Sequence, residues 1–145
     1  FLQKKPLLPP YEEAMLSLKE LKAQNVWQRG DCKLYYTRLT DILRRYISRR
    51  YEVGAMEMTS SQILSSVAAI DTVECQNELR ALLEIADFVK FAKATPLPDE
   101  NTRNLNIAYE FIQHTNQNVK ELQQKEEIQQ LEALEEEQQE TMGTL

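Results

Sequence analysis

A scarcity of glycine is the feature of this sequence that most restricts its fold. Only three glycines occur in 145 residues, whereas a meandering β-sheet needs glycine at many of its tight turns. Residues with high helix propensity, above all Glu, Gln, Leu, Lys, Arg and Ala, are abundant instead. The sequence therefore predicts an all-α fold, and its 42% apolar content is enough for one compact core.

Five segments carry apolar residues at helical spacing, which predicts a compact bundle of about five helices. The first follows Pro9-Pro10 and ends before Asn25. Asp31 is a suitable N-cap for the second and longest helix, and Gly54 is expected to end it.

The remaining helices are also bounded by recognisable residues. Thr59 and Gln62 have the spacing of a capping box and open a short third helix. A fourth helix runs from about residue 74 to 94, and its wide apolar face predicts a central, buried position. Prolines stop it, and Asp99 is expected to cap a fifth helix whose apolar face includes Leu105 and ends near Thr115.

Acidic residues are concentrated at the C-terminal end of the chain. Residues 1–118 contain 15 basic and 15 acidic residues, whereas residues 119–145 contain 2 and 8. We therefore divide the chain into a proline-rich spacer over residues 1–10, a helical domain over residues 11–118 and a Glu/Gln-rich tail over residues 119–145. This tail composition is typical either of a solvated helix or of a disordered segment.

The first ten residues are typical of the cytoplasmic edge of a transmembrane helix. Phe1-Leu2-Gln3 is followed by Lys4-Lys5, as the positive-inside rule requires, and then by a proline-rich spacer. We expect a membrane helix upstream of residue 1, because no uncharged run within the chain approaches the length of a membrane span.

The residues show no motif for catalysis or for binding a cofactor or metal. His114 is the sole histidine, and its expected place near a helix C-terminus predicts a surface residue favoured by the helix dipole rather than a general base. Cys32 and Cys75 cannot build a structural zinc site with a single histidine. We expect a protein that is not an enzyme and that uses no cofactor, metal or small-molecule substrate.

The second predicted helix carries a basic face that includes Arg38, Arg45 and Arg49. The sequence is consistent with four partners for this face: anionic lipid headgroups beneath the anchor, the acidic tail, nucleic acid, or carboxylates of the domain itself.

The fourth predicted helix supplies a second candidate surface, formed by Phe88, Lys90 and Phe91. The two phenylalanines lie three residues apart. They either complete the apolar core face or anchor a protein partner beside charged neighbours.

A helix-turn-helix that binds nucleic acid is the alternative interpretation. Residues 52–58 form a short connection to the third helix, which would serve as the recognition helix. That helix contains no Arg or Lys over residues 60–67, and the body of the chain has no excess positive charge. We therefore expect protein partners rather than nucleic acid.

Four stretches resemble, in order and spacing, the cytoplasmic domain after the last membrane helix of Bat aerotolerance (BatD-like) proteins. They are Pro9-Pro10-Tyr11, residues 34–47, residues 55–59 and residues 86–93 with Pro96, so the resemblance covers residues 9–115 and leaves out the tail. It implies a bacterial inner-membrane protein, often encoded beside a MoxR-type AAA+ ATPase and von Willebrand factor A proteins, with no established activity for this domain. We expect a docking or assembly domain at the cytoplasmic face of that membrane, with such a protein as partner.

Overall fold

The computed structural model describes residues 7–68 and 72–143, and all regular structure within these ranges is helical. Most of the expected N-terminal spacer, residues 1–6, lies outside the described residues. The elements in chain order are α1 (Pro10–Ala23), α2 (Cys32–Tyr51), the 3-10 helix η1 (Ala55–Glu57), α3 (Ser60–Ala68), α4 (Val73–Ala92) and α5 (Pro98–Gly143). The expected all-α fold with five α-helices is confirmed.

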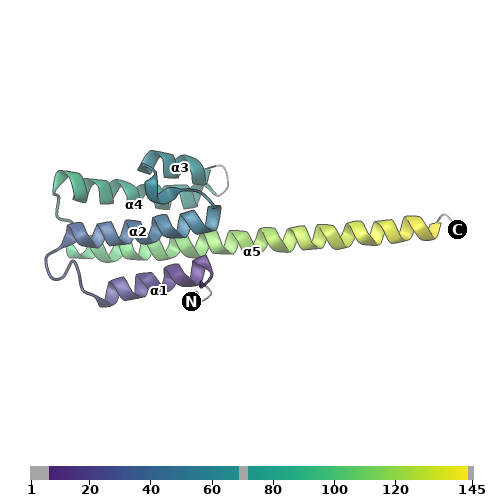
Figure 1. Ribbon diagram of the computed structural model, residues 1–145, viewed down its shortest axis with the longest axis horizontal. Helices are drawn as coiled ribbons and strands as arrows, with labels where there is room; N and C mark the ends of the chain where they lie inside the picture. The colour runs from purple at the N-terminus through teal and green to yellow at the C-terminus, as the bar shows by residue number, and fades with distance from the viewer. Residues whose placement is uncertain (1–6, 69–71, 144–145) are drawn as a thin grey trace, which may run out of the picture.

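Four helices form the body of the bundle, and the short helix α3 packs on its outside. Helices α1, α2, α4 and the first part of α5 alternate in direction, and α3 lies against α4 within the connection between α2 and α4 (Figure 1). Helix α2 contacts α1, α4, α5 and η1. It is therefore α2, and not α4 as the sequence suggested, that occupies the centre.

The core is built around large aromatic side chains from α2 and α5. Tyr35, Tyr36, Tyr46 and Phe111 are all buried, and the rings of Tyr46 and Phe111 meet edge to face at 6.3 Å between centroids. The apolar residues packed around them come from every helix and include Leu18, Leu21, Leu39, Leu43, Ile47, Ile63, Leu79, Leu82, Leu83, Val89 and Ile112.

Two of the predicted helix starts are confirmed in atomic detail. The Asp31 carboxylate accepts a hydrogen bond from the backbone N–H of Leu34 at 3.0 Å. In the capping box, the Thr59 hydroxyl accepts from the Gln62 N–H, and the Gln62 side chain accepts from the Thr59 N–H. The predicted Asp99 cap is wrong, because α5 begins at Pro98 and Asp99 lies in its first turn, where a carboxylate complements the helix dipole.

The expected end of α2 at Gly54 is also wrong. The helix ends at Tyr51, and Glu52 takes the left-handed conformation, with φ of 56°, that reverses the chain. Lys93 does the same after α4, and Asn25 adopts a φ of 52° after α1. In this glycine-poor chain, residues with side chains therefore occupy helix-end positions that glycine usually fills.

Helix α5 is 46 residues long and belongs to the bundle only over its first part. Thr115 is the last fully buried side chain among the described residues of α5, and the side chains described beyond residue 119 are all exposed. The tail therefore continues α5 as a helix that projects from the bundle (Figure 1). None of the described helices combines the length and the apolar character needed to cross a membrane.

Candidate functional site

The basic face of α2 is used within the fold. Arg45 donates two hydrogen bonds to the Glu13 carboxylate of α1, and Arg49 Nη1 lies 3.0 Å from Glu13 Oε2. The hydrogen bond from Arg45 lowers the pKa of Glu13, while burial acts in the opposite direction. Arg38 donates to the side chain of Gln24 at 2.9 Å. All three predicted arginines thus connect α2 to α1 and the residue that follows it.

Two further arginines of α2 contact backbone carbonyl groups. Arg44 donates to the carbonyl oxygens of Ala55 and Met58, which fixes η1 on α2, and Arg50 donates to the carbonyl oxygen of Thr115 in α5. The arginine fork suits this use because it offers several donors in one plane. The basic run of α2, for which the sequence left both external and internal partners open, therefore holds together elements that lie far apart in the chain.

Lys90 also points into the fold rather than toward a partner. Its Nζ donates to Thr40 Oγ1 of α2 at 2.8 Å, and the Thr40 hydroxyl donates to the carbonyl oxygen of Tyr36. Burial, with the nearby positive charge of Arg44, lowers the pKa of Lys90. This lysine bridges α2 and α4.

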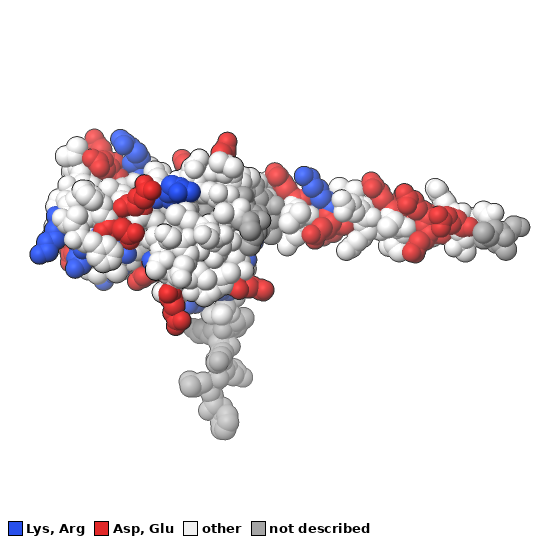
Figure 2. Space-filling view, turned by 90° about the horizontal axis from the view of Figure 1, so that it is seen from above, with Lys and Arg blue, Asp and Glu red and all other residues white. Residues whose placement is uncertain are grey.

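The two predicted phenylalanines lie on the solvent side of α4. Phe88 is 57% exposed and Phe91 is 80% exposed, whereas Val89 between them is buried. Leu97, in the connection to α5, is 67% exposed as well. Figure 2 looks onto the side of the bundle that carries α3 and α4, where broad uncharged areas separate scattered charges. The C-terminal end of α4 therefore presents large apolar side chains to water.

An open cleft of about 410 Å³ adjoins the same end of α4. It lies where the α1–α2 and α4–α5 connections meet, and its lining includes Trp27, Cys32, Lys93 and Pro96. The last turn of α4 thus carries Phe91 on its solvent side and forms one wall of a cleft.

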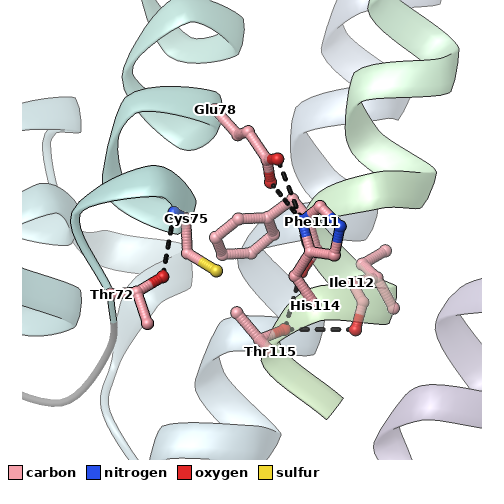
Figure 3. A network of polar contacts seen from close by, with 7 residues as sticks. All are labelled: Thr72, Cys75, Glu78, Phe111, Ile112, His114 and Thr115. Atoms are coloured by element: carbon pink, nitrogen blue, oxygen red, sulfur yellow. Dashed lines mark hydrogen bonds and ion pairs between the residues drawn. The ribbon is translucent and has the colours of Figure 1, made fainter. Parts of the chain in front are cut away.

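The structure brings together three metal-binding residue types that the sequence did not connect. Cys75 and Glu78 project from α4 toward His114 of α5 (Figure 3), and their donor atoms all lie within 4.8 Å of one another. His114 Nδ1 is 3.0 Å from Glu78 Oε1. The expected place of His114 near a helix end is wrong, because α5 continues to Gly143.

One sequence signal could have revealed part of this cluster. Cys75 and Glu78 are three residues apart, which places them on one face of a helix. The approach of His114 depends on the pairing of α4 with α5, which no local pattern specifies. Burial raises the pKa of Glu78, an effect that the charge of His114 opposes and the charges of Glu110 and Glu74 reinforce.

The six predicted interaction residues therefore do not form one surface. The arginines face α1, Lys90 faces α2, and Phe88 and Phe91 face solvent; α1 and α4 lie on opposite sides of α2 (Figure 1). Comparison with family models, curated proteins and solved structures finds no match to this chain, so its resemblance to the Bat proteins stays a prediction.

Proposed function

We propose that residues 11–118 form a non-enzymatic docking module that binds its protein partner through the exposed aromatic end of α4. The observation that carries this proposal is the exposure of Phe88 and Phe91 on one face of a helix whose opposite face is packed in the core. Aromatic side chains of this kind are enriched at the centres of protein interfaces.

The hydrophobic effect favours an aromatic surface that is covered by a partner over one that is exposed to water. Moving a phenylalanine side chain from water into a packed interface is worth about 1.5–3 kcal/mol. Phe88 and Phe91 provide only part of this stabilisation to the isolated domain, because 57% and 80% of them, respectively, remain exposed to water. A partner that covers both side chains gains it as binding free energy, less the cost of association.

The resemblance to BatD-like proteins supplies the partner and the location of this proposal. The partner is a MoxR-type AAA+ ATPase or a von Willebrand factor A type Bat protein, held at the cytoplasmic face of the bacterial inner membrane. The anchor in this proposal is a transmembrane helix upstream of residue 1, and the Lys4-Lys5 pair in the sequence supports a cytoplasmic location by the positive-inside rule. Since Arg38, Arg45 and Arg49 have partners on α1 or just after it, the proposal no longer depends on them.

Co-purification from membranes tests this proposal. The full-length protein is expressed with its genomic neighbours, either unchanged or with Phe88→Ala and Phe91→Ala together. We expect the double variant to recover the partner about tenfold less well, which corresponds to about 1.4 kcal/mol. Leu16→Ala is the matched control, because Leu16 is also a half-exposed apolar residue, but on α1.

Two outcomes would contradict the proposal. Equal recovery of the partner by the double variant and the unchanged protein removes the aromatic surface from the interface. Equal recovery after deletion of residues 11–118 removes the domain from docking altogether. The helix-turn-helix alternative stays a prediction, which salt-dependent binding of duplex DNA checks.

A further inference from the structure

We propose that Cys75, Glu78 and His114 form a binding site for a transition-metal ion of the Zn²⁺ class. The three residues supply one thiol, one carboxylate and one imidazole, and their donor atoms lie within 4.8 Å of one another between α4 and α5. This inference is independent of docking through the aromatic end of α4.

The spacing of the donor atoms is close to that of a tetrahedral zinc site. Zinc bonds of about 2.3 Å to sulfur and about 2.0 Å to nitrogen or oxygen place neighbouring donor atoms roughly 3.3–3.6 Å apart. His114 Nδ1 and Glu78 Oε1 are already 3.0 Å apart, and Sγ of Cys75 lies within 4.8 Å of both side chains. Small side-chain rotations are therefore enough to surround an ion, which then takes water as its fourth ligand.

The chemistry of the donors selects the class of metal. Thiolate and imidazole are preferred by Zn²⁺, Co²⁺ and Cu²⁺, whereas Mg²⁺ and Ca²⁺ require mainly oxygen ligands. A thiolate from Cys75 and the carboxylate of Glu78 together balance the two positive charges of the ion. The acidic side chains of Glu74 and Glu110 also act electrostatically on Glu78, and their negative charge favours a cation at this position.

Burial gives the cluster a fixed inner part and an accessible outer part. Cys75 is 1% exposed and lies in the first turn of α4, where its N–H donates to the Thr72 hydroxyl. The side chains of Glu78 and His114 are 19% and 51% exposed, respectively. An ion therefore reaches the thiol from the His114 side, and Phe111, which is fully buried, lies beside the cluster (Figure 3).

A bound ion would join two helices that already contact each other. Helices α4 and α5 pack side by side, and a polar contact of 3.0 Å between His114 Nδ1 and Glu78 Oε1 crosses their interface. Metal–ligand bonds in place of this contact strengthen the interface, because a metal that binds only the folded protein stabilises it by mass action.

Titration with Co²⁺ tests the site in tag-free, full-length chain purified without chelator. We expect one equivalent of Co²⁺ to give a thiolate-to-cobalt charge-transfer band and the visible bands of a tetrahedral ion, and Zn²⁺ to displace it. Cys75→Ser removes the charge-transfer band. His114→Gln and Glu78→Gln each weaken binding by about tenfold or more, in line with the loss of a ligand. Cys32→Ser is the matched control and leaves the spectrum unchanged, because Cys32 lies at the start of α2.

Thermal unfolding provides a second measurement, because Cys75→Ser changes a core residue. His114 is exposed, so His114→Gln folds, and we expect Zn²⁺ to raise the melting temperature of the unchanged protein but not of this variant. No charge-transfer band at millimolar Co²⁺ overturns the proposal. An unchanged spectrum in Cys75→Ser, undiminished affinity in His114→Gln, or loss of the band in Cys32→Ser also overturns it.

Discussion

At the scale of single residues, a buried polar network connects α2 to the first two turns of α5. The Tyr36 hydroxyl donates to Asn101 Oδ1 at 2.7 Å and accepts from Asn104 Nδ2 at 2.8 Å. The neighbouring Tyr35 hydroxyl donates to the backbone carbonyl of Asn101 at 3.2 Å. Burial raises the pKa of both tyrosines, so they remain neutral donors. The start of α5 is thereby fixed against α2.

Removal of the Tyr36 hydroxyl should be more costly than removal of the Tyr35 hydroxyl. Tyr36→Phe leaves two buried side-chain groups, on Asn101 and Asn104, without this partner, whereas Tyr35→Phe leaves one carbonyl oxygen. We expect Tyr36→Phe to lower the free energy of unfolding by about 2–3 kcal/mol, and Tyr35→Phe by about 1 kcal/mol. Urea unfolding of the two variants measures the difference, and equal losses would contradict the larger role assigned to the Tyr36 hydroxyl.

The contact between Glu13 and the arginines of α2 makes stability depend on pH. Glu13 has a lowered pKa in the folded protein, so its contribution is fully present above the ordinary carboxyl pKa and is lost as the pH falls through the lower folded value. We expect Glu13→Gln to lower the free energy of unfolding by about 1 kcal/mol at pH 7. At about pH 3 the difference from the unchanged protein becomes much smaller.

Urea unfolding at the two pH values checks this expectation, with Glu12→Gln as the control. Glu12 and Glu13 both lie in the first turn of α1, so the two variants lose the same favourable interaction with the helix dipole. The Glu12 carboxylate is exposed. An equal effect of both variants at pH 7 would assign the stabilisation to the dipole and not to Arg45 and Arg49.

Residues whose partners are close in sequence could be predicted, and residues with distant partners could not. The Thr59–Gln62 capping box and the Asp31 cap depend on atoms three residues away, so the sequence pattern contains both partners. The approach of Glu13 to Arg45 spans 32 residues and depends on how α1 packs on α2. The cluster of Cys75, Glu78 and His114 could not be predicted for the same reason, because His114 reaches the other two residues only through the packing of α5 on α4.

At the scale of elements, apolar spacing located all five α-helices but not the depth at which each is buried. Helix α4 has a wide apolar face, which predicted a central position. The structure leaves Phe88 and Phe91 in water and places α2 at the centre instead. The arginines of α2 lowered its apparent apolar character, although they satisfy groups of neighbouring elements. An apolar pattern therefore predicts which side chains favour burial, but it does not show whether the protein's own core or another molecule covers them.

Helix ends provide a prediction about stability. Glu52 holds the left-handed conformation after α2, which costs a residue with a side chain about 1 kcal/mol relative to glycine. We expect Glu52→Gly to raise the free energy of unfolding by about 0.5–1 kcal/mol, after allowance for the greater freedom of glycine in the unfolded chain. Glu52→Gln keeps a side chain of the same size at this position and removes only the charge. Urea unfolding should therefore show a larger gain for Gly than for Gln, and equal gains would assign the effect to the charge.

At the scale of the whole molecule, the protein combines a packed bundle with a projecting acidic helix. Both parts share α5, so the division that the sequence predicted near residue 118 is a change in contacts within one continuous helix. The tail exposes apolar side chains along its length, namely Leu122, Ile128, Leu131, Leu134 and Met142. Figure 2 shows acidic side chains prevailing along the same segment. Repulsion between like charges opposes the pairing of two such tails.

Deletion of residues 120–145 tests whether the tail stands apart from the bundle. The described side chains of this segment are all exposed, so we expect the free energy of unfolding to change by less than about 0.5 kcal/mol. The deletion removes about 36 Å of helix, at 1.5 Å per residue over residues 120–143. We therefore expect the maximum dimension from small-angle X-ray scattering to fall by a similar amount, and light scattering to give a monomer before and after the deletion. A tail packed against the bundle would instead leave the maximum dimension nearly unchanged and make the deletion destabilising. A tail that pairs with a second copy would make the mass of the intact protein depend on its concentration.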